Sequence, residues 1–138
     1  MKILELLTPK RLLGNRGERA AVKYLKRKGY VILEKGYVSG KSEIDIIAST
    51  EDTVVFVEVK TRSAKSRSPK EPRPASAVNR EKQRKIISAA VRYKRDVNFR
   101  MRFDVMEVIA HTNEKGKEVF EITHTISAFD GNTAAIPH

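Results

Sequence analysis

Two consecutive apolar, β-branched segments of the chain carry charged residues where a strand usually places uncharged ones. Glu43 and Asp45 belong to the first segment, and Glu58 and Lys60 belong to the second. Because strand side chains alternate between two faces, each pair shares one face of its strand. Clustered carboxylates bind hard divalent cations, and a lysine beside such a cation can orient or deprotonate water. The pattern therefore favours metal-assisted chemistry in this part of the chain.

A hairpin would bring the two segments together. Residues 50–53 are expected to close it, with Ser49 opposite Val54. In that register Asp45 lies across from Glu58. Two carboxylates roughly 5 Å apart repel by about 3 kcal/mol at an effective dielectric near 20. A divalent metal would turn this repulsion into binding, whereas a shift of one residue in the register would place the two groups on opposite faces.

A third carboxylate, Glu18, is expected on the apolar face of a helix that spans residues 14–28. Ala21, Val22 and Leu25 follow it at helical spacing. A carboxylate that faces inward is costly unless a partner binds it. Glu18 is therefore either a partly solvated glutamate favoured by the start of the helix or a further member of the acidic cluster.

Together these groups favour hydrolysis of a phosphodiester bond. Asp45 and Glu58 would hold one or two Mg²⁺ or Mn²⁺ ions, and Glu18 would complete or support the coordination shell. Lys60 would act on water or stabilise developing charge. Glu43 is ambiguous, because the same register offers it Lys60 as a partner and solvent at the strand end. The alternative is a solvated sheet face with cross-strand ion pairs, which the apolar residues on both faces of the strands argue against.

The composition points to a polyanionic partner. The 138 residues, 40% of them hydrophobic, fit one domain with a real core, and the formal net charge is +11. This excess favours nucleic acid or an anionic membrane surface. We expect nucleic acid, because no long basic amphipathic helix rich in large apolar residues is present. The sequence also lacks cysteine and any apolar run long enough to span a membrane, so we expect a cytoplasmic protein.

Positive charge is concentrated between residues 60 and 85, where ten lysines and arginines accompany two acidic residues. Residues 61–76 also contain several serines and prolines, which predicts a flexible loop. Such a segment would bind phosphates without sequence preference and with strong salt dependence. The alternative is a loop that only improves solubility. The residues expected to contact nucleic acid are Arg62, Lys65, Arg67, Lys70, Arg73, Arg80, Lys82 and Gln83.

We expect a single domain over residues 1–138, with a core at about 14–125 and a frayed tail at 131–138. Gly14 and Gly17 would let the first helix approach the sheet closely. The order of elements is α-β-β-β-α-β with a possible further strand. Periodicity and turn residues predict helices at 14–28 and 79–93, a strand that begins with residues 30–33, strands at 42–48, 54–60, 102–109 and 119–125, and a turn at 113–116.

These residues carry a resemblance. Asp45, followed by Glu58-Val59-Lys60 at the end of the next strand, looks like the PD-(D/E)xK nuclease signature. The predicted order of elements is similar to the core of that superfamily, which includes type II restriction enzymes and archaeal Holliday junction resolvases. More narrowly, the chain resembles the YraN-like family of bacterial proteins. Its motifs here are GNRGERAA at 14–21, EIDIIA at 43–48, FVEVKTR at 56–62 and RFDV at 102–105.

The resemblance implies an α/β fold with a restriction-endonuclease-like core, in which helices flank a mixed central β-sheet. It also implies that Glu18, Asp45, Glu58 and Lys60 occupy catalytic positions, with Mg²⁺ or Mn²⁺ as the cofactor. We therefore expect a nucleic-acid-binding protein that acts as a metal-dependent endonuclease on DNA rather than RNA, with branched or structured DNA as the substrate class. Cutting both strands would require a homodimer.

Other classes of protein stay open. The first alternative is a non-catalytic DNA- or RNA-binding protein that retains the nuclease fold. An RNA-processing or ribosome-associated factor fits the charge equally well, and a protein of the membrane surface would bind liposomes, which we do not expect. His111, His124 and His138 lack the spacing of metal ligands and receive no role. Asp104 is expected to be structural.

Overall fold

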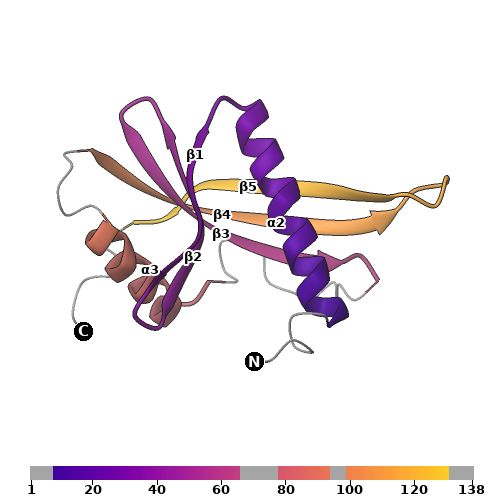
Figure 1. Cartoon of the computed structure of the whole chain (residues 1–138), viewed down its shortest axis with the longest axis horizontal. Helices are drawn as coiled ribbons and strands as arrows, with labels where there is room; N and C mark the ends of the chain where they lie inside the picture. The colour runs from indigo at the N-terminus through magenta and orange to yellow at the C-terminus, as the bar shows by residue number, and fades with distance from the viewer. Residues whose placement is uncertain (1–7, 66–77, 94–98, 131–138) are drawn as a thin grey trace.

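The computed structural model describes residues 8–65, 78–93 and 99–130. They form a five-stranded sheet with a helix on each face, in the order α-β-β-β-α-β-β (Figure 1). The fold is the predicted α/β class with a restriction-endonuclease-like core. The elements are α2 (Pro9–Arg27), β1 (Val31–Ser39), β2 (Ser42–Thr50), β3 (Thr53–Ser63), α3 (Arg80–Tyr93), β4 (Arg100–Thr112) and β5 (Glu118–Phe129).

Helix α2 begins before the predicted start at residue 14. Thr8 caps it by accepting a hydrogen bond at Oγ1 from the amide of Arg11 at 3.2 Å, and Pro9 supplies a favourable first residue. The helix ends before Gly29, whose φ of +92° disfavours other residues. A Cβ atom at Gly17 would lie 2.5 Å from Cγ2 of Thr61 on β3, so this glycine does allow a close approach. The same expectation for Gly14 was wrong, because a Cβ there would contact nothing within 4 Å.

The predicted hairpin between β2 and β3 is confirmed near its turn. Ser49 pairs with Val54, and two residues connect the strands. The predicted register holds as far as Ile46 and Val57, where the pairing of these strands ends. Asp45 and Glu58, the next residues, are therefore not paired across the ladder.

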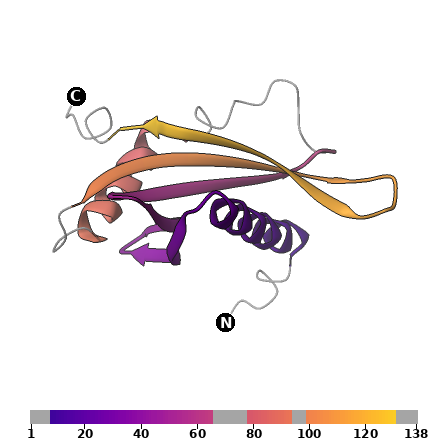
Figure 2. The ribbon, with the colours of Figure 1, turned by 90° about the horizontal axis from the view of Figure 1, so that it is seen from above.

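The sheet has the order β1-β2-β3-β4-β5, and only the β3–β4 pair is parallel. The crossover through α3 makes this parallel pairing possible. Strands β1 and β2 turn steeply away from β3, β4 and β5, as Figures 1 and 2 show. β2 stays paired with β1 as far as Ser42 while it leaves β3. The sheet therefore splits beside Asp45.

Two apolar clusters cover the two faces of the sheet. Helix α2 packs mainly on β3 and β4, where Leu25 and Val57 belong to the first cluster. Helix α3 packs on β2 from the other face, where Ile86 and Phe56 belong to the second. Because Phe56 faces α3, strand alternation also directs Glu58 toward α3. The burial of both faces explains the long apolar stretches of these strands.

The structure gives the full extent of the remaining strands. β1 extends to Ser39, β4 extends past residue 109, and β5 forms a full partner for β4. The turn expected at residues 113–116 is present, and the amide of Gly116 donates to the carbonyl of Asn113 at 3.0 Å. Most of the expected loop at 61–76 and the tail at 131–138 lie outside the described residues. None of the described helices combines the length and the apolar character needed to cross a membrane.

Asp104 is fully buried on β4 and has partners on several sides. Arg102 donates to it from Nε at 2.9 Å and from Nη2 at 2.8 Å, and also reaches the Tyr30 hydroxyl at 2.6 Å. The amide of Ser127, at a φ of 53°, donates to Asp104 at 3.0 Å. His124 Nε2 lies 2.7 Å from the same carboxylate. The sequence assigned His124 no role, because the histidines lack the spacing of metal ligands. In the structure His124 belongs to the group of hydrogen-bonded residues around the buried Asp104.

Candidate functional site

Asp45 lies where β2 and β3 separate. Its Oδ2 atom accepts a hydrogen bond from the amide of Val59 at 2.7 Å, so the side chain binds a backbone group that β2 no longer pairs with. Two pockets meet at this residue, one of about 440 Å³ toward α3 and one of about 360 Å³ toward α2. The Asp45 side chain is therefore reached from both sides of the sheet.

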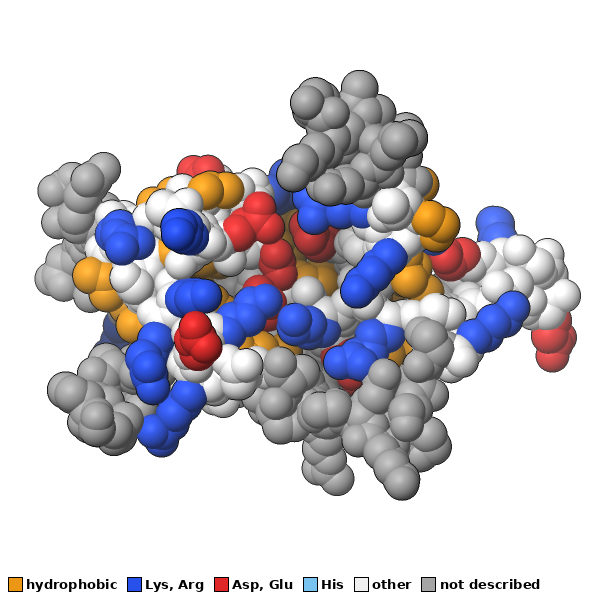
Figure 3. Space-filling model, turned by 90° about the horizontal axis from the view of Figure 1, so that it is seen from below, with side chains coloured by type: hydrophobic (Ala, Val, Ile, Leu, Met, Phe, Trp, Pro, Cys, Tyr) orange, Lys and Arg blue, Asp and Glu red, His pale blue; other side chains and the backbone are white. Residues whose placement is uncertain are grey.

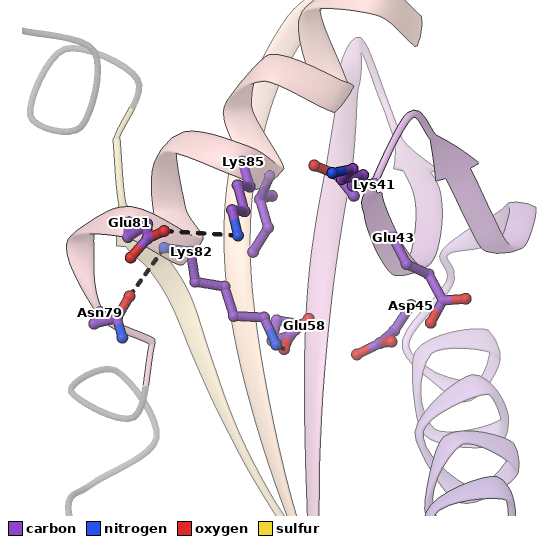
Figure 4. Close-up of a pocket in the computed structure, with 10 residues that line it drawn as sticks. Lys41, Glu43, Asp45, Glu58, Asn79, Glu81, Lys82 and Lys85 are labelled. Carbon is purple, nitrogen blue, oxygen red and sulfur yellow. Dashed lines mark hydrogen bonds and ion pairs between the residues drawn. The ribbon is translucent and has the colours of Figure 1, made fainter.

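Glu58 faces the pocket on the α3 side, and its side chain is only 4% exposed. Two lysines neutralise it. Lys82 Nζ lies 2.5 Å from Glu58 Oε2, and Lys60 Nζ lies 3.6 Å from the same atom. Figure 4 shows Lys82 extending from α3 to Glu58, with Asp45 and Glu43 across the pocket. The ion pair of Lys60 thus goes to Glu58 and not to Glu43.

The start of helix α3 places Lys82 in this position. Asn79 caps the helix by accepting a hydrogen bond at Oδ1 from the amide of Lys82 at 2.9 Å (Figure 4). Gln83 donates from Nε2 to the carbonyl of Val78 at 2.8 Å, and Val78 is buried in the apolar cluster. The first turn of α3 is therefore fixed to the sheet, with Lys82 directed at Glu58.

Burial and the neighbouring charges shift the pKa values of the ionisable groups in the site. Burial raises the pKa of Asp45 to about 8, and the neighbouring Glu58 carboxylate adds to this shift. Partial burial and then the charge of Glu43 raise the pKa of Glu18. Partial burial and then the charge of Lys82 lower the pKa of Lys60. Burial lowers the pKa of Lys82, but the hydrogen bond to Glu58 and the attraction of that carboxylate outweigh burial, so the pKa is raised. The site therefore contains two carboxyl groups that disfavour each other's ionised form, with two lysine amines beside them.

Glu18 lies on the α2 side and lines the second pocket together with Asp45. Its charge raises the pKa of Asp45, but less than Glu58 does. Within the described ranges, no three carboxylate or imidazole groups are close enough together to hold a metal ion. The structure thus brings Asp45 and Glu58 together and leaves Glu18 beside them.

The structure does not bring the residues expected to contact nucleic acid together in one pocket. Arg67, Lys70 and Arg73 lie outside the described residues. Lys65 lines a different hollow, beside the end of β3 and the start of α2. The side-chain amide of Gln83 binds the backbone carbonyl of Val78. Lys82 lies in the pocket itself, whereas Arg62 on β3 and Arg80 at the start of α3 are not among the residues that line it.

Two lysines that line the pocket were not among the residues named as contacts for nucleic acid, although Lys85 belongs to the basic region at residues 60–85. Lys41 follows Gly40 in the turn between β1 and β2, and Lys85 follows Lys82 one helical turn later. Gly40 has a φ of 61° and marks the hairpin turn, which would have indicated where Lys41 lies. Acidic side chains cross the middle of one face of the molecule, with lysines and arginines on both sides (Figure 3).

Comparison with known proteins finds one family over most of these elements. Residues 17–108 match the family described as "Uncharacterised protein family UPF0102", and this range contains Glu18, Asp45, Glu58 and Lys60. A UPF0102 protein of Chlorobium phaeobacteroides is 43% identical over 122 residues, which cover 85% of this chain and 93% of the relative. A UPF0102 protein of Caldanaerobacter subterraneus is 38% identical over 123 residues, covering 87% of this chain and 96% of the relative. The chain therefore belongs to the UPF0102 family, the YraN-like family that its motifs resemble.

Proposed function

We propose that this protein is a metal-dependent endonuclease that hydrolyses phosphodiester bonds of DNA at the Asp45–Glu58 pair. The single observation that carries the proposal is the position of these two carboxylates. They lie together at the split of the sheet, and burial and mutual repulsion raise the pKa of Asp45 to about 8. A protein that gained only stability from these residues would have no reason to keep two acids there.

Two of the residues offer the kind of ligand that a hard divalent cation takes. Asp45 and Glu58 offer carboxylate oxygens at the wall of one open pocket, which are the ligands that Mg²⁺ and Mn²⁺ prefer. When bound, the ion would neutralise phosphate charge and lower the pKa of a bound water. Glu18 would support the shell from the α2 side, where it lines the second pocket.

The two lysines supply the remaining groups. Lys60 has a lowered pKa because of partial burial and the nearby Lys82, so its amine accepts a proton less readily, and releases one more readily, than an exposed lysine. Lys60 would therefore hold or move a proton beside the scissile phosphate. Lys82 would release Glu58 to the cation and contact a phosphate oxygen instead. Both amines already lie beside Glu58, at 3.6 Å for Lys60 and 2.5 Å for Lys82.

The proposed substrate is branched or otherwise structured DNA. The net charge of +11 favours a polyanion, and a chain of 138 residues has few elements left for reading bases. One site cuts one strand, so two copies of the protein would cut both strands of such a substrate.

A second candidate function is non-catalytic binding of DNA or RNA. The observation that favours it is the 2.5 Å contact between Lys82 and Glu58, because a lysine already supplies the positive charge that a metal would bring. In that case the acidic pair and its lysines would be a structural remnant in a nucleic-acid-binding protein.

Cleavage of labelled duplex, single-stranded, flap and four-way-junction DNA tests the proposal. The assay uses Mg²⁺ and Mn²⁺ at low salt, with Lys60→Ala as the site variant and Lys117→Ala, from the β4–β5 turn, as a matched control. We expect metal-dependent cutting that Lys60→Ala abolishes and Lys117→Ala retains. Binding of DNA without cutting in either metal would favour the second candidate.

A further inference from the structure

The pocket on the α2 side of Asp45 is lined by positive charge. Arg19, Lys23 and Lys26 come from α2, and Lys35 comes from β1. The three helical residues are spaced by four and three positions, so they form one stripe along α2. All four residues are exposed, and within the ranges that the structure describes none of them forms an ion pair. Their charge is therefore available to a ligand.

This pocket shares lining residues with two neighbouring hollows. It shares Asp45 with the pocket on the α3 side, and it shares Asn15 and Glu18 with a hollow of about 330 Å³ near the start of α2. That third hollow adds Lys10 and Arg11. The three hollows follow one another from α3 past Asp45 and along α2.

The arrangement of charge fits an extended polyanion. Lysines and arginines lie on both sides of a line of acidic side chains (Figure 3). A cation-flanked path of this kind can hold a phosphate backbone over carboxylates that would otherwise repel it. A membrane surface would instead need exposed apolar side chains beside the cations. The apolar residues of the α2-side pocket, Val22 and Ile46, are both buried.

We infer that the α2 side is a second nucleic-acid-binding surface, on which Arg19, Lys23, Lys26 and Lys35 hold the strand beyond the reaction site. The strand crosses from the α3 pocket past Asp45 and continues along α2. The surface lies at the opposite side of Asp45 from the α3 pocket and its Lys82. Its position relative to a scissile phosphate rests on the proposed function, whereas binding itself does not.

Binding without divalent metal tests this inference. The probe is a fluorescein-labelled oligonucleotide, single-stranded and duplex, titrated at several salt concentrations. Lys23→Gln/Lys26→Gln removes two charges from the α2 surface, and Lys41→Gln/Lys85→Gln removes two from the α3 pocket. Lys115→Gln/Lys117→Gln removes two from the β4–β5 turn and serves as the matched control. Glutamine and lysine have similar helix propensities, so α2 and α3 should fold normally.

We expect the first two double variants to bind several-fold more weakly. The slope of log affinity against log salt should become shallower by about 0.7 to 0.9 for each phosphate that a variant no longer neutralises. The control should keep both values close to those of the unchanged protein. If Lys23→Gln/Lys26→Gln matches the control while Lys41→Gln/Lys85→Gln does not, the strand ends at Asp45 and the inference is overturned.

The cleavage assay separates this result from the proposed function. Selective loss of binding in Lys23→Gln/Lys26→Gln, together with no cleavage in any metal, would support the surface and refute the nuclease. Cleavage and binding that this variant leaves unchanged would support the nuclease and refute the surface.

Discussion

Lys82 on helix α3 lies closer to the Glu58 carboxylate than Lys60 does, at 2.5 Å against 3.6 Å, although Lys60 is on the same strand as Glu58. The charge partner of this buried acid thus comes from another element of the fold. A divalent cation at Glu58 would compete with Lys82 for the same oxygen. The metal-free protein and the metal-bound protein should therefore depend on Lys82 to different extents.

Lys82→Gln should lower the free energy of unfolding of the metal-free protein by about 1–3 kcal/mol, because it removes the nearer of the two lysines that neutralise the buried Glu58 carboxylate. Mg²⁺ or Mn²⁺ should restore part of this stability. Urea denaturation with and without metal measures both effects. Lys85→Gln is the control, since Lys85 is exposed and pairs with the exposed Glu81 at 3.7 Å. Equal effects of the two substitutions would refute the role of Lys82.

Asp45→Asn should stabilise the metal-free protein at neutral pH. The pKa of Asp45 is about 8 in the folded state and near 3.8 in the unfolded state, so the folded state binds more protons between these values. Stability should therefore fall as the pH rises from about 4 to 8. Asparagine keeps an oxygen for the Val59 amide and removes this dependence. We expect a gain on the order of 1–3 kcal/mol at pH 8.

Thermal unfolding across this pH range checks the prediction, with Asp52→Asn as a control on an exposed aspartate. The variant should also lose any cleavage while it keeps its affinity for DNA. A destabilised Asp45→Asn protein would indicate that the carboxylate is needed for folding, which would remove the electrostatic basis for a metal site.

Gly17→Ala should destabilise the protein by about 1–3 kcal/mol, because the new methyl group would lie 2.7 Å from Cβ of Thr61 and closer still to other atoms of that side chain. It would push α2 away from β3 and move the adjacent Glu18. Gly14→Ala on the same helix meets nothing within 4 Å and should stabilise it by up to about 1 kcal/mol. Chemical denaturation of both variants gives the comparison. Similar values for the two would contradict the close contact.

Asp104→Asn should destabilise the fold by about 3–5 kcal/mol, since it leaves the Arg102 guanidinium without its partner in a buried site. Burial opposes the charge of Asp104, but hydrogen bonds from His124 and Arg102 lower its pKa. A lowered pKa adds stability above the unfolded value near 3.8, and this stability disappears as the pH falls below it. The stability of the unchanged protein should therefore fall more steeply below about pH 4 than that of Asp104→Asn. Urea denaturation at several pH values measures both slopes, and equal slopes would contradict the assignment.

The sequence predicts the β2–β3 hairpin well near its turn, because a short connection and the alternation of apolar residues define the pairing of Ser49 with Val54. The sequence does not predict that this pairing ends before Asp45. Past Ile46, β2 follows β1 away from β3, and local spacing contains no information about where a twisted sheet divides. The two carboxylates still meet, because the Asp45 side chain turns into the gap and binds the Val59 amide.

The contact between Lys82 and Glu58 could not be derived from spacing. The apolar periodicity predicts the helix from residue 79, within one residue of the start of α3 at Arg80, and Asn79 caps it in the structure. Where α3 docks depends on the crossover between parallel strands and on how Ile86 and Val78 pack in the core. The sequence analysis assigned no role to Arg19, Lys23 and Lys26, because only the fold places these residues beside Asp45.

Calorimetric titration of Mn²⁺ into the protein at pH 7, in two buffers with different enthalpies of ionisation, tests the Asp45–Glu58 site most directly. Asp45 is mostly protonated at this pH, because its pKa is about 8. We predict binding that releases about one proton, and no such binding in Asp45→Asn or Glu58→Gln. Binding that releases no proton, or that persists in both variants, would contradict a metal site at this carboxylate pair.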